Sequence, residues 1–172
     1  MNQNLDILIK DHRRLLNQII NLLNDINNEL YTNYNDFLMN HTIGEHFRHI
    51  YDFYYQFFEC LNLGYIDYDT RLRDNKLETD HIVMMKSFSQ IKEKLSFKNN
   101  KKLNIYYQLD NSKISNSVDS NIERELLFIH SHTLHHLAMI RGVLESKFNF
   151  KFNNDFGFAS STSLHKEINN RK

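Results

Sequence analysis

The segment of residues 124–141, RELLFIHSHTLHHLAMIR, constrains the fold most strongly, because it places four histidines within seven residues of one predicted helix. At about 100° per residue, the apolar positions of this helix form a single stripe. The stripe contains Leu126, Ile129, Thr133, Ile140, Val143 and Leu144. His136 falls inside the stripe and His132 lies one turn before it, whereas His130 and His135 point away to either side. Burial of this stripe therefore encloses two imidazoles, whose ring nitrogens need partners.

A metal ion shared by His132 and His136 would satisfy both rings without the repulsion of two charged imidazoles. A third protein ligand is available in a second histidine cluster, HTIGEHFRHI at residues 41–50. There His46 and His49 lie along one edge of an apolar stripe, and either ring can point between helices. Three imidazoles from two helices leave at least one coordination position open, which is typical of catalytic rather than structural metal sites.

The composition favours an all-α fold, because proline is absent and only four glycines occur. The 172 residues are enough to bury a sizeable core, and we predict a single domain over residues 1–172. Lys plus Arg balance Asp plus Glu to a formal net charge of zero. This balance argues against partners that bind through long-range electrostatic attraction, such as nucleic acid or an anionic membrane surface.

Localisation is predicted to be cytoplasmic. No apolar run approaches the ~20 residues needed to span a bilayer, and Asp6 and Lys10 interrupt any signal-peptide core. The single cysteine, Cys60, excludes an intrachain disulfide and agrees with a reducing compartment. We interpret Cys60 as a small buried side chain rather than a reactive thiol.

Four amphipathic segments are predicted as helices, at about residues 3–30, 42–62, 76–96 and 120–147. The tail at 148–172 is predicted to pack through an aromatic segment around Phe156 and Phe158 and to finish in a frayed polar end. A small β insertion is expected between the third and fourth helices, because the sequence there alternates and carries β-branched and aromatic residues around an Asp-Asn-Ser turn. The predicted architecture is therefore a four-helix bundle with a short hairpin, and the cores of such bundles often hold metal ligands on facing helices.

The ends of these predicted elements follow from short polar signals. Thr42 is the predicted N-cap of the second helix, with Glu45 completing a capping box. Asp119 or Ser120 is predicted to cap the fourth helix. The hairpin is placed at residues 103–118.

Three further features admit both a structural and a functional interpretation. The aromatic stretch YDFYYQFFECL is either core or the wall of a substrate pocket that includes Tyr54. The charged loop GYIDYDTRLRDNKLETDH is either a solvated connection or a source of arginines, Arg71 and Arg73, for an anionic substrate group. His12 lies on the apolar stripe of the first helix and is interpreted as hydrogen-bonded to a neighbour rather than as a ligand.

Four motifs together resemble the DinB-like superfamily, and specifically a bacterial branch of it: TIGEHFRHI, DYDTRLRDNKLETD, RELLFIHSHTLHHLAMIR and DFGFASST. They cover most of residues 40–162, in the expected order. The resemblance implies a four-helix bundle with a three-histidine divalent metal site, with one ligand from the second helix and two from an HxxxH motif in the last. Carried onto this sequence, it implies His49, His132 and His136 as ligands, and it selects His49 over His46.

The resemblance also implies an activity, since characterised members include thiol transferases that use low-molecular-weight bacterial thiols. We expect a metal-dependent transferase or hydrolase acting on a small molecule, in which the ion lowers the pKa of a bound thiol or water. The candidate catalytic residues are Glu45, His46 and Arg48, and the candidate substrate-binding residues are Arg71, Arg73 and Tyr54. Zinc is the expected ion, with nickel, iron or manganese as alternatives, because imidazole suits several divalent metals.

Two other functions stay open from the sequence. One is a metal-binding or stress-associated bundle without turnover, because a family likeness supplies a site and not a reaction. The other is a purely structural bundle with incidental histidines. A homodimer is expected by analogy with similar bundles, whereas the neutral charge and the lack of a basic stripe give no support to nucleic-acid binding.

Overall fold

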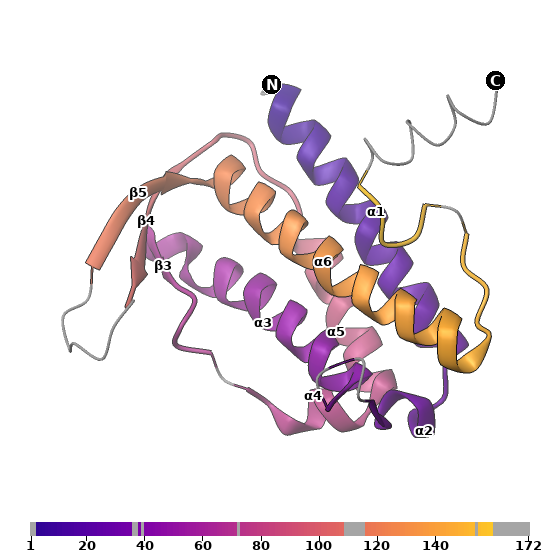
Figure 1. Cartoon of the computed structure of the whole chain (residues 1–172). Coiled ribbons are helices and arrows are strands. Elements are labelled where there is room, and N and C mark those ends of the chain that lie inside the picture. The colour runs from indigo at the N-terminus through magenta and orange to yellow at the C-terminus, as the bar shows by residue number, and fades with distance from the viewer. Residues whose placement is uncertain are drawn as a thin grey trace.

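The computed structural model describes residues 3–35, 38, 40–71, 73–108, 116–153 and 155–159. Its helices and strands follow in this order (Figure 1): α1 (Gln3–Asp25), α2 (Asn28–Tyr31), β1 (Tyr34–Asn35), β2 (His41–Thr42), α3 (Ile43–Cys60), the 3-10 helix η2 (Leu61–Leu63), β3 (Tyr65–Asp67), α4 (Asn75–Thr79), α5 (His81–Lys94), β4 (Lys102–Tyr107), β5 (Asn116–Asn121) and α6 (Ile122–Phe148). The described chain is thus mostly helical with a small sheet, which confirms the predicted helical character.

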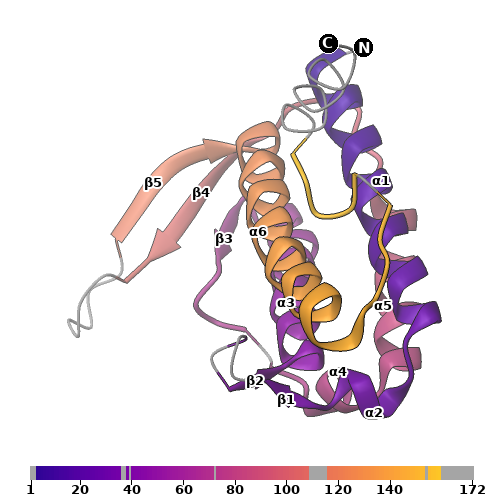
Figure 2. The same ribbon diagram turned by 45° about the vertical axis from the view of Figure 1, so that its right-hand side comes forward.

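The four longest helices form a bundle in which α1 and α3 each pack against both α5 and α6. Figures 1 and 2 show α3 and α6 side by side, running in opposite directions. The core lies between these helices and consists of the apolar stripes that the periodicity predicts. Fully buried members include Leu15, Ile19, Leu23, Phe47, Phe57, Phe88, Leu126, Ile129 and Ile140.

Two of the predicted helices are interrupted, because polar side chains bind the backbone at the break. The helix predicted for residues 3–30 ends at Asp25, and Asn27 caps the short α2 by accepting a hydrogen bond from the Leu30 N–H. The helix predicted for residues 76–96 is divided at Asp80, whose carboxylate accepts from the first backbone N–H groups of α5. Asn and Asp compete for backbone groups in this way more readily than other residues do.

The caps of the two helices that carry the histidine clusters differ in how well they were predicted. At the start of α3, the Thr42 hydroxyl accepts from the Glu45 N–H and the Glu45 carboxylate accepts from the Thr42 N–H, which confirms the capping box. At the start of α6, the cap is Asn121, the last residue of β5, and not Asp119 or Ser120, which lie earlier in that strand. The helix begins only where the strand pairing stops.

The small sheet has the order β3-β4-β5. β4 and β5 form the predicted hairpin, which reaches outward from the end of the bundle where α6 begins (Figure 2); the predicted Asp-Asn-Ser turn lies outside the described residues. β3 was not predicted; it pairs in parallel with β4 and places Ile66 opposite Ile105. Ile66 is fully buried, so β3 fastens the hairpin to the bundle. No helix in the described part of the chain is long and apolar enough to cross a membrane.

The segment after α6 folds back along the bundle. Asn149 ends the helix with a left-handed backbone conformation (φ 50°). Phe156 is buried, as the aromatic pattern of the predicted tail suggests, and Arg141 donates a hydrogen bond to its carbonyl at 2.8 Å. The polar end predicted for the tail lies outside the described residues.

Candidate metal centre

Three imidazoles meet between α3 and α6. His49 comes from α3, and His132 and His136 lie one turn apart on α6. One nitrogen from each ring lies within 4.8 Å of the others. The ring centroids of His49 are 4.9 Å from those of both His132 and His136, which are themselves 4.6 Å apart. The structure therefore brings together the three residues that the resemblance implies as ligands.

The electrostatics of the cluster keep these rings neutral. Burial, followed by repulsion from neighbouring histidines and arginines, lowers the pKa of His49 to about 3 and that of His132 to about 4. Burial and the adjacent histidines lower the pKa of His136 to about 3. Neutral imidazole is the form that binds metal, because its unprotonated nitrogen carries a lone pair.

The donor set fits a divalent ion. The Nε2 atom of His132 is buried and has no hydrogen-bond partner in the described part of the chain, which is costly unless a ligand satisfies it. Metal–nitrogen bonds of about 2.0–2.1 Å require ligand nitrogens on one ion to lie less than about 4.2 Å apart. The nitrogens, which lie within 4.8 Å of one another, thus need only small ring movements to share an ion.

His46 contacts the cluster through His136. Its Nδ1 lies 2.8 Å from Nδ1 of His136, so one of these rings donates to the other. Spacing alone left His46 and His49 as alternative third ligands. The structure places His49 among the three converging rings and His46 in contact with one of them, His136. A hydrogen bond of this kind orients a metal-binding ring.

A pocket of about 240 Å³ adjoins the cluster and is lined by His41, Glu45, His46, Arg48, His49 and His136. The carboxylate of Glu45 is occupied by the helix cap and lies 3.3 Å from Nδ1 of His41. Although burial alone would raise the pKa of Glu45, the Thr42 N–H and His41 together lower it. Glu45 is therefore an anion at neutral pH.

The arginines predicted for the site have three different placements. Arg48 binds Asp52 and Glu78, each at 2.7 Å, so its charge is already compensated by two carboxylates. Arg71 lies with Nη1 3.2 Å from Nδ1 of His49. Arg73 is exposed, with a left-handed backbone conformation (φ 51°).

Tyr54 is fully buried, so a substrate arriving from solvent does not reach its hydroxyl in this structure. That hydroxyl bonds to Nδ1 of His12 at 2.8 Å, and Nε2 of His12 donates to the Leu126 carbonyl at 2.9 Å. The interpretation of His12 as a satisfied core residue is confirmed, and the core interpretation of Tyr54 replaces its predicted substrate contact. Cys60 is also buried, and burial raises the pKa of its thiol, which disfavours the reactive thiolate.

An aromatic wall lies on the other side of the cluster; Phe53 belongs to the stretch interpreted as core or pocket wall, whereas Phe128 and Tyr68 were missed as part of the site. The Phe53 ring centroid lies 4.3 Å from that of His132, and Phe128 stacks on His132 at 6.0 Å. Tyr68 packs against both phenylalanines. Helical spacing could have identified the first two, because Phe53 follows His49 by four residues and Phe128 precedes His132 by four.

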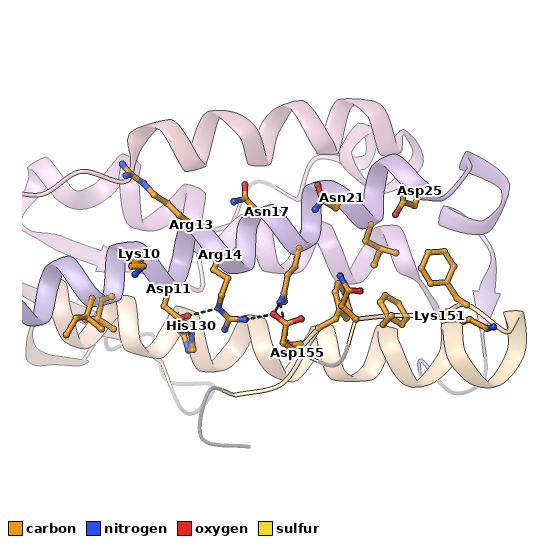
Figure 3. Close-up of a pocket in the computed structure, with 18 of the residues that line it drawn as sticks. Lys10, Asp11, Arg13, Arg14, Asn17, Asn21, Asp25, His130, Lys151 and Asp155 are labelled. Atoms are coloured by element: carbon orange, nitrogen blue, oxygen red, sulfur yellow. Dashed lines mark hydrogen bonds and ion pairs between the residues drawn. The ribbon is translucent and has the colours of Figure 1, made fainter. Parts of the chain in front are cut away.

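A larger groove of about 880 Å³ lies elsewhere, between α1 and the segment after α6 (Figure 3). Four of its charged groups are paired with one another: Asp11 binds His130 at 2.5 Å and Arg14 at 2.7 Å, and Arg14 reaches Asp155 at 3.5 Å. These pairs hold the returning segment against α1. The groove therefore offers fewer free ligand groups than its size suggests.

Comparisons of this chain with protein-family models, with curated proteins and with solved structures found no match. The candidate site consequently depends on its own geometry. That geometry provides three converging neutral imidazoles, an adjoining polar pocket and an aromatic wall.

Proposed function

We propose that the chain is a divalent-metal protein of the DinB-like type that uses His49, His132 and His136 to hold one ion and acts on a small molecule. The observation that carries this proposal is the convergence of the three rings, with the buried Nε2 of His132 lacking a partner among the described residues. The sequence motifs support the same ligand set independently. Zinc is the ion we favour, with nickel, iron and manganese as alternatives.

Three protein ligands leave a coordination position for an exchangeable ligand. When bound, such an ion lowers the pKa of a thiol or water in that position, so that the anion becomes the nucleophile for transfer or hydrolysis. The 240 Å³ pocket beside His49 and His136 gives this ligand a route to the site. The size of the pocket suits a low-molecular-weight thiol better than a macromolecule.

The surrounding residues then have distinct roles. His46 holds the ring of His136 through its Nδ1 contact. Glu45, which lines the pocket as an anion, is the group best placed to accept a proton from an incoming ligand. Arg48 fixes α3 to α4 through Asp52 and Glu78 and is a positioning residue, because both carboxylates already occupy its guanidinium.

A metal-binding bundle without turnover is the second candidate. The observation that favours it is that two charged side chains of the pocket already have partners, since Glu45 is bound to the helix cap and Arg48 to two carboxylates. A catalytic site usually keeps such groups free for the substrate. The two functions share the metal site and differ only in turnover.

An assay of sulfur transfer separates the two. Zinc-loaded protein is incubated with bacillithiol or glutathione and an electrophile, with and without a chelator. If the chain is an enzyme, the chelator should abolish turnover and added zinc should restore it. The His132→Ala variant should lack turnover, whereas His135→Ala should retain it. Stoichiometric zinc without turnover for either thiol would contradict the transferase and support the binding protein.

A further inference from the structure

The loop between β3 and α4 carries Arg71 directly to one of the three rings. Nη1 of Arg71 lies 3.2 Å from Nδ1 of His49, and the guanidinium carbon lies 5.2 Å from the Phe53 ring centroid. The loop is anchored to both α6 and α3, because the Tyr68 hydroxyl donates to the Glu125 carboxylate at 2.9 Å and the Gln56 amide donates to the Thr70 hydroxyl at 3.3 Å. Arg71 is therefore presented to His49 by a fixed backbone.

This contact determines where the proton of His49 lies. A guanidinium has only N–H donors and does not lose its proton in proteins, so Nδ1 of His49 must be the acceptor. The proton of the neutral ring is then on Nε2. Neither nitrogen of His49 has a lone pair left for a metal ion, and a protonated ring would have none either.

The other two rings have no such restriction. Nε2 of His132 has no partner in the described part of the chain. His136 faces His46 through Nδ1, and because either imidazole can donate in that bond, His136 can keep an unprotonated Nε2. Within the described part of the chain, His49 is the one ring of the three whose lone pair is occupied by a permanent donor.

Arg71 itself is incompletely satisfied. Its Nε is buried without a hydrogen-bond partner, and no carboxylate among the described residues lies within ion-pairing distance of its guanidinium. Arg48, by contrast, has two carboxylate partners. A half-buried cation with an unpartnered donor is a binding group for a carboxylate or phosphate oxygen.

We propose that Arg71 couples metal loading to an anionic ligand: it occupies the lone pair of His49 in the metal-free protein, and it must leave that ring when a metal binds, which frees its guanidinium for the anionic group of the substrate. This proposal rests on the metal site of the proposed function and narrows its substrate class to anion-bearing small molecules. Coupling of this kind is reciprocal, so an anion that captures Arg71 also strengthens metal binding.

Zinc affinity of the untagged full chain tests the proposal, measured by competition with a chromophoric chelator. Arg71→Met removes the donor, and Arg73→Met in the same loop is the matched control. In chloride buffer, Arg71→Met should bind zinc about tenfold more tightly than wild type, the equilibrium equivalent of one hydrogen bond from a charged donor, and Arg73→Met should not. Added acetate should tighten zinc binding by wild type and leave Arg71→Met unchanged.

Equal or weaker zinc binding by Arg71→Met than by wild type would overturn the coupling while leaving the metal site intact. Absence of stoichiometric zinc in both proteins would instead overturn the proposed function. Nitrogen-15 NMR of the His49 ring in the metal-free protein gives a second test that needs no metal. The proton should reside on Nε2 in wild type and lose that preference in Arg71→Met; a proton on Nδ1 in wild type would refute the contact.

Discussion

His132 and His135 are three residues apart on α6, yet they differ in environment. The ring of His132 faces His49 and the aromatic wall, whereas His135 is exposed. Replacement of His132 by Ala should abolish stoichiometric metal binding, because two imidazoles remain and the ion loses a protein ligand. His135→Ala should keep it. Elemental analysis of untagged protein after metal loading and desalting checks both, and full metal retention by His132→Ala would remove that residue from the ligand set.

His12 provides a pH-dependent test of the core, away from the three ligands. Burial, followed by repulsion from His130, lowers its pKa to about 4 from an ordinary value of 6.5. Since protonation then favours the unfolded chain, the stability that neutral His12 contributes is complete above about pH 6.5 and is lost as the pH falls toward about 4.

We therefore expect the metal-free wild type to lose about 2 kcal/mol more unfolding free energy than His12→Gln between about pH 7 and about pH 5. Urea unfolding of both proteins at each pH measures this difference. Parallel pH profiles for the two would show that His12 does not remain neutral in the folded core. The comparison with His12→Gln removes the pH-dependent contributions that the two proteins share.

The contact between α3 and α4 requires a glycine. A Cβ added at Gly44 would overlap the backbone carbonyl of Glu78 and press on the Tyr31 ring. Both residues are held in place by their side chains, since the Glu78 carboxylate accepts from Arg48 and the Tyr31 hydroxyl donates to the Leu77 carbonyl. Gly44→Ala should therefore lower the unfolding free energy by about 1–3 kcal/mol. Gly142 lies on the exposed side of α6 with open space around it, so Gly142→Ala should be neutral or stabilising by up to about 1 kcal/mol. Urea unfolding measures both, and equal effects would contradict the close approach of α4.

Elements with strong local signals could be predicted from the sequence. The periodic apolar stripes identified the long helices, and the Thr42 and Glu45 pair fixed the start of α3. β3 was missed because its deciding contact is distant in the chain. β3 has only three residues, and its partner β4 lies about forty residues later, so no local pattern marks it.

The histidine cluster could be predicted only in part, because one of its three members depends on a tertiary contact. Two ligands share one helix face, and their spacing identified them. The third required a choice between His46 and His49 that depends on how α3 is rotated against α6, which is a tertiary property. The contact of Arg71 with His49 was beyond local reasoning, because it depends on the path of the loop between β3 and α4.

For the whole molecule, a metal bridging α3 and α6 should stabilise the fold. An ion that binds only the folded state, at a free concentration one hundred times its Kd, adds about 2.7 kcal/mol to the unfolding free energy. In a domain of this size that corresponds to a Tm increase of roughly 5–10 °C. Differential scanning calorimetry should show this increase for wild type with zinc and none for His132→Ala. An equal increase in both proteins would assign the stabilisation to another site.

X-ray absorption spectroscopy of the zinc-loaded, untagged protein examines the coordination of the ion most directly, because its fine structure reports the number and type of ligand atoms. We predict a first shell of nitrogen and oxygen at about 2.0–2.1 Å, with multiple-scattering features of three imidazoles and one lighter exchangeable ligand. A shell with fewer than three imidazoles, or one that contains protein sulfur, would contradict the assignment of His49, His132 and His136 to a single ion.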